Sequence, residues 1–174
     1  AAPYVFVHKN SPFDDTFSMS VVFNGWLYIA ADAKLYQMQD DTTYTLRKTF
    51  GANISALLAV GDKLYCGLGD STNYQTMNTS HTFSTVPVVP ARLFTLWNGF
   101  LWRAVTNSVY YTSDETNWTT VEVADSGYTV TGFAGFQNEI IVSTENALYR
   151  IAPGDVVLQI TRWSVPDSAN GVSM

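Results

Sequence analysis

A motif of about 38 residues returns four times along this chain of 174 residues, and it constrains the fold more than any other feature. Each copy has a short turn pair, then a leucine or isoleucine, and a tyrosine nine or ten residues later. The aliphatic positions are 37, 37 and 39 residues apart, and the pairs are Leu27 with Tyr36, Leu64 with Tyr74, Leu101 with Tyr110, and Ile140 with Tyr149. A period of this length indicates a repeat architecture with one supersecondary unit per copy.

Each copy predicts four short strands joined by tight turns. The first strand ends at a two-residue turn such as Asn24-Gly25 or Asn98-Gly99, in which both residues accept a positive φ. The second strand follows at once, the third carries the tyrosine, and a fourth closes the unit. Four antiparallel strands in about 40 residues form one β-propeller blade, so the chain is predicted to be an all-β propeller of about four blades.

The sequence also predicts where the blades begin and end. A single propeller domain covers 1–174, and the blades span approximately 17–50, 51–90, 91–125 and 126–163. Residues 1–16 have the pattern of an outer strand from a neighbouring blade, and 164–174 that of the start of a next one. Either four blades close on themselves, or they form part of a larger propeller. The spare strands at both ends favour the larger propeller.

Composition limits the classes of partner. Charged residues make up 14% of the chain, and the net charge is −6 with nine Lys and Arg. Nine basic side chains are too few to form a basic stripe that neutralises a phosphate backbone. A nucleic-acid partner is therefore not expected. No apolar run approaches the ~20 residues needed to span a bilayer, which predicts no membrane insertion. The single Cys66 excludes an internal disulfide and a cysteine-based zinc site.

One segment of the third copy resembles a known propeller motif. Ser113-Asp114-Glu115-Thr116-Asn117-Trp118 is similar to the Asp-box hairpin of the sialidase-like propellers, Ser-x-Asp-x-Gly-x-Thr-Trp. The segment departs from that pattern at the glycine and lacks one residue before Trp118. In that family the motif is a structural turn on the face opposite the active site. The resemblance therefore implies a turn between the third and fourth strands, with Trp118 in the blade core, and does not imply catalysis.

We predict no enzyme, cofactor or metal site. Sialidases bind the substrate carboxylate with an arginine cluster and use a tyrosine nucleophile paired with a carboxylate. The arginines of this chain do not recur at equivalent, inward-pointing positions; they are Arg47, Arg92, Arg103, Arg150 and Arg162. His8 and His81 fall nearly two blades apart without companion ligands. A fragment of a sialidase-like hydrolase is thus the third alternative for function.

Turns at one end of the propeller provide the candidate binding residues. The turns between second and third strands and the connections between blades are expected to share the face on which propellers usually bind. The candidates there are Asp32, Asp70, Asn107, Asn146, Asp125 and Tyr128. An acidic, Asn-rich rim with an aromatic edge suits sugar hydroxyls or Ca2+. The same residue types are equally expected in turns for geometric reasons.

A non-catalytic scaffold is the first functional hypothesis. Low charge, many Thr, Asn and aromatic residues, and irregular repeats resemble the propeller domains of phage virion components such as tail hub or nozzle proteins. That resemblance implies other protein subunits as partners, in a homo-oligomeric ring, and a virion or extracellular location. The second hypothesis is a carbohydrate-binding propeller, in which the aromatic residues Trp26, Trp97, Trp102 and Tyr128 stack on sugars. Since Trp26 and Trp102 occupy strand positions that recur in every copy, packing is favoured for them.

Glycines in the fourth copy have a structural interpretation. Gly132-Phe133-Ala134-Gly135 is short and lies within a predicted first strand, so it does not match a phosphate-binding loop. A glycine inside a strand often marks a close approach of another chain segment. We therefore expect these glycines to relieve crowding near the propeller axis.

Overall fold

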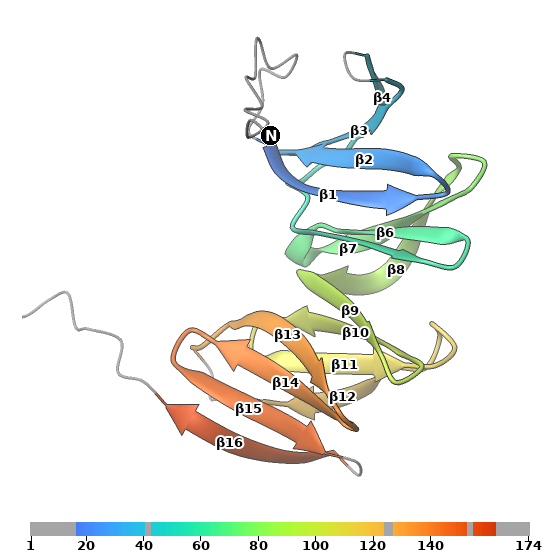
Figure 1. Ribbon diagram of the computed structural model, residues 1–174. Helices are drawn as coiled ribbons and strands as arrows, with labels where there is room; N and C mark the ends of the chain where they lie inside the picture. Colours follow the sequence, from blue (N-terminus) through green and yellow to red (C-terminus); the bar gives the residue numbers. More distant parts are fainter. Residues whose placement is uncertain (1–16, 41–42, 124–126, 153–154, 163–174) are drawn as a thin grey trace, which may run out of the picture.

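The described part of the computed structural model is an array of four β-sheets. It comprises residues 17–40, 43–123, 127–152 and 155–162. Throughout these residues the backbone forms strands and turns, with no helix. Each sheet contains four antiparallel strands, and the sheets follow one another in chain order from blue to red (Figure 1). The predicted fold class, four-stranded antiparallel propeller blades, is confirmed.

Within every blade the strands pair in chain order, as a meander. Blade 1 consists of β1 (Phe17–Phe23), β2 (Trp26–Ala31), β3 (Lys34–Met38) and β4 (Tyr44–Thr49). Blade 2 consists of β5 (Ala56–Val60), β6 (Lys63–Gly67), β7 (Gly69–Asn78) and β8 (Phe83–Ala91). Blade 3 consists of β9 (Leu93–Trp97), β10 (Phe100–Val105), β11 (Ser108–Thr112) and β12 (Thr119–Glu122). Blade 4 consists of β13 (Val130–Phe136), β14 (Glu139–Thr144), β15 (Ala147–Ala152) and β16 (Val156–Arg162). Residues 1–16 and 164–174, predicted to belong to neighbouring blades, lie outside the described residues.

The hairpin turns after β1 and β9 have the backbone conformation that their sequences predict. Asn24 and Gly25 have φ values of 48° and 77°, and Asn98 and Gly99 have 51° and 80°. Positive φ at both central residues matches the right-handed twist of the two strands, as in a type I′ turn. The turns thereby set the register that pairs Phe23 with Trp26. In each of these two blades, the register determines which side chains of the second strand face each side of the sheet.

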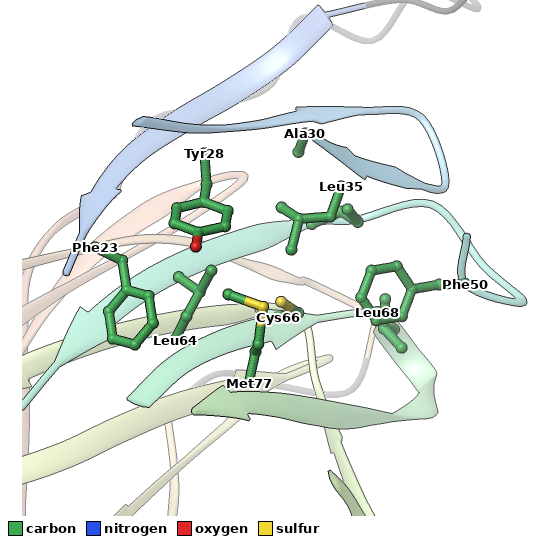
Figure 2. Close-up of a cluster of buried hydrophobic side chains, with 10 residues drawn as sticks. Phe23, Tyr28, Ala30, Leu35, Phe50, Leu64, Cys66, Leu68 and Met77 are labelled. Atoms are coloured by element: carbon green, nitrogen blue, oxygen red, sulfur yellow. The ribbon is translucent and has the colours of Figure 1, made fainter. Parts of the chain in front are cut away.

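The hydrophobic core consists of three clusters, one between each pair of consecutive blades. β1 lies beside β5, β5 beside β9, and β9 beside β13, so the first strand of each blade is innermost. Figure 2 shows the cluster between blades 1 and 2, where Tyr28 and Leu35 lie over Leu64, Cys66 and Met77. Packing one sheet face on the next buries the apolar side of every inner blade. The stability of the array therefore depends on contacts between blades.

The recurring aliphatic position has a constant role in the three later blades. Leu64 packs against blade 1, Leu101 against blade 2, and Ile140 against blade 3. In blade 1 the next residue, Tyr28, faces blade 2, so Leu27 faces away from it by strand alternation. Leu27 thus lies on the face of blade 1 that would receive a preceding blade.

Tyr74 does not occupy the register that the other three recurring tyrosines share. Ile29 pairs with Tyr36 and Val142 with Tyr149, and Tyr110 occupies the same register in blade 3. In blade 2 the corresponding residue, Cys66, pairs with Gln75. Tyr74 therefore points the other way, into the cluster between blades 2 and 3. The cause is its spacing of ten residues from Leu64, since a shift of one residue moves a side chain to the opposite face.

Gly135 allows the inner strands of blades 3 and 4 to approach closely. A Cβ atom built on Gly135 would overlap the six-membered ring of Trp97. Gly132, in the same strand, is less crowded, because a Cβ atom built there would meet only the Ser143 hydroxyl, at 2.9 Å. The predicted relief of crowding is therefore confirmed at Gly135.

Candidate binding rim and contacts between blades

The turns between second and third strands meet the connections that lead into the next blade. Ile54 N donates to Asp32 O at 2.8 Å, and Val130 N donates to Thr106 O at 2.8 Å. Ile54 and Val130 follow the last strands of blades 1 and 3, so the same bond recurs two blades apart. These turns and connections therefore lie at one end of the array, which we call the rim.

Asp32 and Asp70 have structural roles at the rim. Asp32 lies in the turn between β2 and β3 with a φ of 48°, a conformation that aspartate tolerates better than most residues. Asp70 Oδ1 accepts a hydrogen bond from Thr106 N at 2.8 Å, which joins blade 2 to a turn of blade 3. The Asp70 carboxylate thus caps a backbone group of the neighbouring blade.

The two asparagines of the rim are bonded within their own blades. Asn107 accepts from Thr106 Oγ1 at 3.2 Å and donates to Glu122 Oε2 at 3.4 Å. Asn146 is buried and accepts from Thr144 Oγ1 at 3.1 Å. Both asparagine side chains are therefore engaged by polar side chains of their own blade.

The remaining rim candidates do not complete a ligand set. Tyr128 is half-buried next to Thr129, whose backbone N donates to Glu145 Oε2 at 3.0 Å. Asp125 lies outside the described residues. Among the residues that the structure describes, no three His, Cys, Asp or Glu side chains gather in a way that could hold a metal ion.

Asp114 organises the turn between β11 and β12, at the end of blade 3 opposite the rim. Its Oδ1 accepts from Thr116 N and Asn117 N at 2.8 Å each and from Thr112 Oγ1 at 2.9 Å. These hydrogen bonds, those from Asn117 above all, hold the pKa of Asp114 well below its usual range. Trp118 packs against the cluster between blades 2 and 3. The segment that resembles an Asp-box is therefore a structural turn in this protein.

Tyrosine hydroxyls connect each blade to the turn between the third and fourth strands of the next. Tyr28 Oη lies 2.9 Å from His81 Nε2 in blade 2, and Tyr111 Oη donates to Asp155 Oδ1 in blade 4 at 2.9 Å. Between blades 2 and 3, burial and a hydrogen bond to Glu115 raise the pKa of Tyr65. These contacts were not predicted from the sequence. The sequence signal that could have indicated these contacts is a tyrosine in a strand of one copy together with a polar residue in a turn of the next copy.

Arg103 is a buried cation between blades 2 and 3, only 6% exposed. Its guanidinium carbon lies 3.9 Å from the centre of the Tyr110 ring and 4.6 Å from that of Trp118. Nη1 donates to the Pro90 carbonyl at 2.7 Å. Burial lowers the pKa of Arg103, and aromatic faces offset part of the cost of burying its charge. The geometry makes Arg103 a packing residue of the interface.

Three solved structures show to which fold the array belongs. The extracellular domain of BT4673 from B. thetaiotaomicron matches with a TM-score of 0.73 and 19% identity over 90% of this chain and 23% of that chain. Virginiamycin B lyase from Staphylococcus aureus matches with a TM-score of 0.67 and 11% identity over 90% and 59%. The WD40 repeats of RRP9 match with a TM-score of 0.62 and 12% identity over 86% and 52%. The fold is a β-propeller.

The likeness to these structures is one of fold alone. The chain spans less than two thirds of each of these chains. No family model matches the sequence, and no curated protein matches it. Within the described residues no helix is long and apolar enough to cross a membrane.

Proposed function

We propose that this chain is a non-catalytic β-propeller module that scaffolds other protein subunits, as a structural component of a phage virion of the tail hub or nozzle type. One observation carries the scaffold role. The two end faces of the array leave large apolar side chains exposed, whereas the three interfaces inside the array bury theirs.

Exposure is high on both end faces. On blade 4 the exposed side chains are Phe136, Leu158 and Ile160, at 57%, 42% and 52%. On blade 1 Val22 and Leu46 are exposed at 65% and 48%. Large apolar side chains exposed together on one face mark protein interaction sites. A scaffold that packs against other subunits through its end faces accounts for both surfaces.

The rim supports the same proposal. Asp70, Asn107 and Asn146 engage backbone groups or neighbouring side chains, so their hydrogen-bonding capacity serves the turns. The virion role is supported by the low charge and the Thr, Asn and aromatic content, together with the irregular repeats. The structures named above include no virion component, so that part of the proposal depends on composition.

A carbohydrate-binding propeller is a weaker alternative. Of the aromatic residues considered for sugar stacking, Trp97 and Trp102 pack against the cluster between blades 3 and 4. Trp26 is 41% exposed, but it lies beside the turn between β1 and β2, at the opposite end of blade 1 from the rim. The name of virginiamycin B lyase describes the activity of that protein, and 11% identity extends only its fold to this chain.

Immunogold electron microscopy tests the virion role. A gold-labelled antibody against the chain should decorate the tail of phage particles whose genome encodes it. Unlabelled particles, with the chain free in the lysate, would contradict that role. Selective retention on a glycan array would favour the carbohydrate-binding alternative. Turnover of a fluorogenic glycoside, abolished by an arginine substitution, would favour the hydrolase.

A further inference from the structure

We propose that two copies of this chain associate head to tail, with the outer face of blade 4 of each copy packed on the outer face of blade 1 of the other. Counting only the four blades that the structure describes in each copy, two copies would contribute eight blades to one ring. The inference deepens the proposed scaffold function, on which it rests, by naming a second copy of the chain as the partner. Three observations support it.

First, blade 1 carries the side chains with which a blade packs on a preceding one. Ile140 and Val142 of blade 4 face blade 3, and Tyr149 pairs with Val142. The same positions of blade 1 are occupied by Leu27, Ile29 and Tyr36, with Leu46 next in the row. All of these are apolar or aromatic, as expected for a face that receives another blade.

Second, blade 4 has the matching face for a following blade. Ile141 occupies the position held by Tyr28, Tyr65 and Trp102, each of which lies between its own blade and the next. Around Ile141 lies an open hollow of about 450 Å³, lined among others by Phe136, Leu158 and Ile160. In the three interfaces inside the array this space is filled by the next blade.

Third, the charges complement each other. Trp102 pairs with Tyr111, whose hydroxyl reaches Asp155 in the turn of the next blade. Ile141 pairs in the same way with Arg150, so Arg150 takes the place of that tyrosine. The corresponding turn of blade 1 contains the exposed Asp40. Head-to-tail packing therefore directs Arg150 of one copy towards Asp40 of the other.

The local partners of these two charges are compatible with that contact. Arg150 Nη1 lies 3.4 Å from Glu139 Oε1, and the guanidinium has five N–H donors, enough for two carboxylates. Asp40 Oδ1 accepts from Thr43 N at 2.8 Å, and a carboxylate has further lone pairs. In the proposed contact, Arg150 lies between Glu139 of its own copy and Asp40 of the other copy. This pairing of opposite charges favours a second copy as the partner over a neutral apolar surface.

Sedimentation equilibrium of the 174-residue chain tests the proposal. The wild-type protein should have twice its chain mass of 19.3 kDa. Leu158→Asp on blade 4 and Leu46→Asp on blade 1 should each give a folded monomer. Leu96→Asp is the matched control, because Leu96 is 47% exposed but lies on β9, away from both end faces, and this variant should stay dimeric. Circular dichroism checks that every variant is folded.

Mixing separates head-to-tail packing from a symmetric face-to-face contact. A mixture of Leu158→Asp and Leu46→Asp should recover a dimer, because one of its two interfaces joins two unchanged faces. Arg150→Glu should weaken the dimer about tenfold or more, the size expected for about 1.4 kcal/mol. Adding Asp40→Asn, which keeps the acceptor for Thr43 N, should recover part of that loss.

Three results would overturn the proposal: a wild-type monomer, a dimer that only one of the two face variants disrupts, or polymers longer than a dimer. These results are distinguishable from failure of the proposed virion role. A monomer that still labels phage tails overturns the ring alone, whereas a dimer that labels no particle overturns the virion role alone.

Discussion

Replacing Gly135 with alanine is expected to destabilise the protein by forcing apart the inner strands of blades 3 and 4. The new methyl group would overlap carbons of the Trp97 indole, far inside the 3.0 Å that side-chain contacts essentially never reach. Gly135 has no positive φ, so the backbone itself would accept alanine. The effect therefore measures only the collision with Trp97.

The magnitude follows from two opposing contributions. Overpacking a closely packed site costs about 1–3 kcal/mol. Alanine reduces the conformational entropy of the unfolded chain and returns about 0.4–1 kcal/mol. The overlap is with a large ring that packs against the cluster between blades 3 and 4, so we expect the upper part of the range. A net loss of about 2 kcal/mol corresponds to a fall in Tm of about 4–8 °C for a chain of this length.

Thermal unfolding followed by circular dichroism measures this change, with two controls in the same chain. Gly132→Ala meets only the hydroxyl of Ser143, which can rotate away, so its Tm should be close to that of the wild type. The double variant Gly135→Ala/Trp97→Leu should lose less than the sum of its single variants, because the smaller side chain removes the collision. Equal Tm values for Gly135→Ala and Gly132→Ala would refute the close packing of Trp97 on β13.

Three further predictions concern ionisable groups. Burial first, and then Arg47, lower the pKa of His81 below 6.5, so the folded state favours the neutral ring. The stability of the protein, measured as its urea midpoint, should therefore fall as the pH drops below about 6.5. The variant His81→Asn, which tolerates the φ of 60° at this position, should make the urea midpoint less dependent on pH. Because the pKa of Asp114 is lowered in the folded state, its contribution to stability is present above about pH 4 and lost in acid. Asp114→Ala should therefore lower the Tm at neutral pH more than Asp114→Asn, which keeps the Oδ1 acceptor. Equal losses of Tm would refute the role of that oxygen. Burial raises the pKa of the Cys66 thiol to about 12, so a thiol reagent should react only as the protein unfolds in urea, and rapid reaction in native buffer would contradict its burial.

The sequence was sufficient to predict the blade as a unit. Strand periodicity and the Asn24-Gly25 and Asn98-Gly99 turns are local signals, because they depend on residues a few positions apart. The recurring position of Leu27 then indicated how many such units the chain contains. It could not indicate the face of Tyr74, where one additional residue between Leu64 and the tyrosine reverses the direction of the side chain.

The tertiary structure alone decided which groups meet between blades. Tyr28 and His81, or Asp70 and Thr106, are dozens of positions apart and carry no local pattern that pairs them. Their contact depends on the angle and distance at which one sheet packs on the next. The same packing engages the rim carboxylates and amides in structural hydrogen bonds, and it leaves Leu46 and Leu158 exposed on the end faces. Local sequence sets backbone conformation, whereas burial is a property of the assembled array.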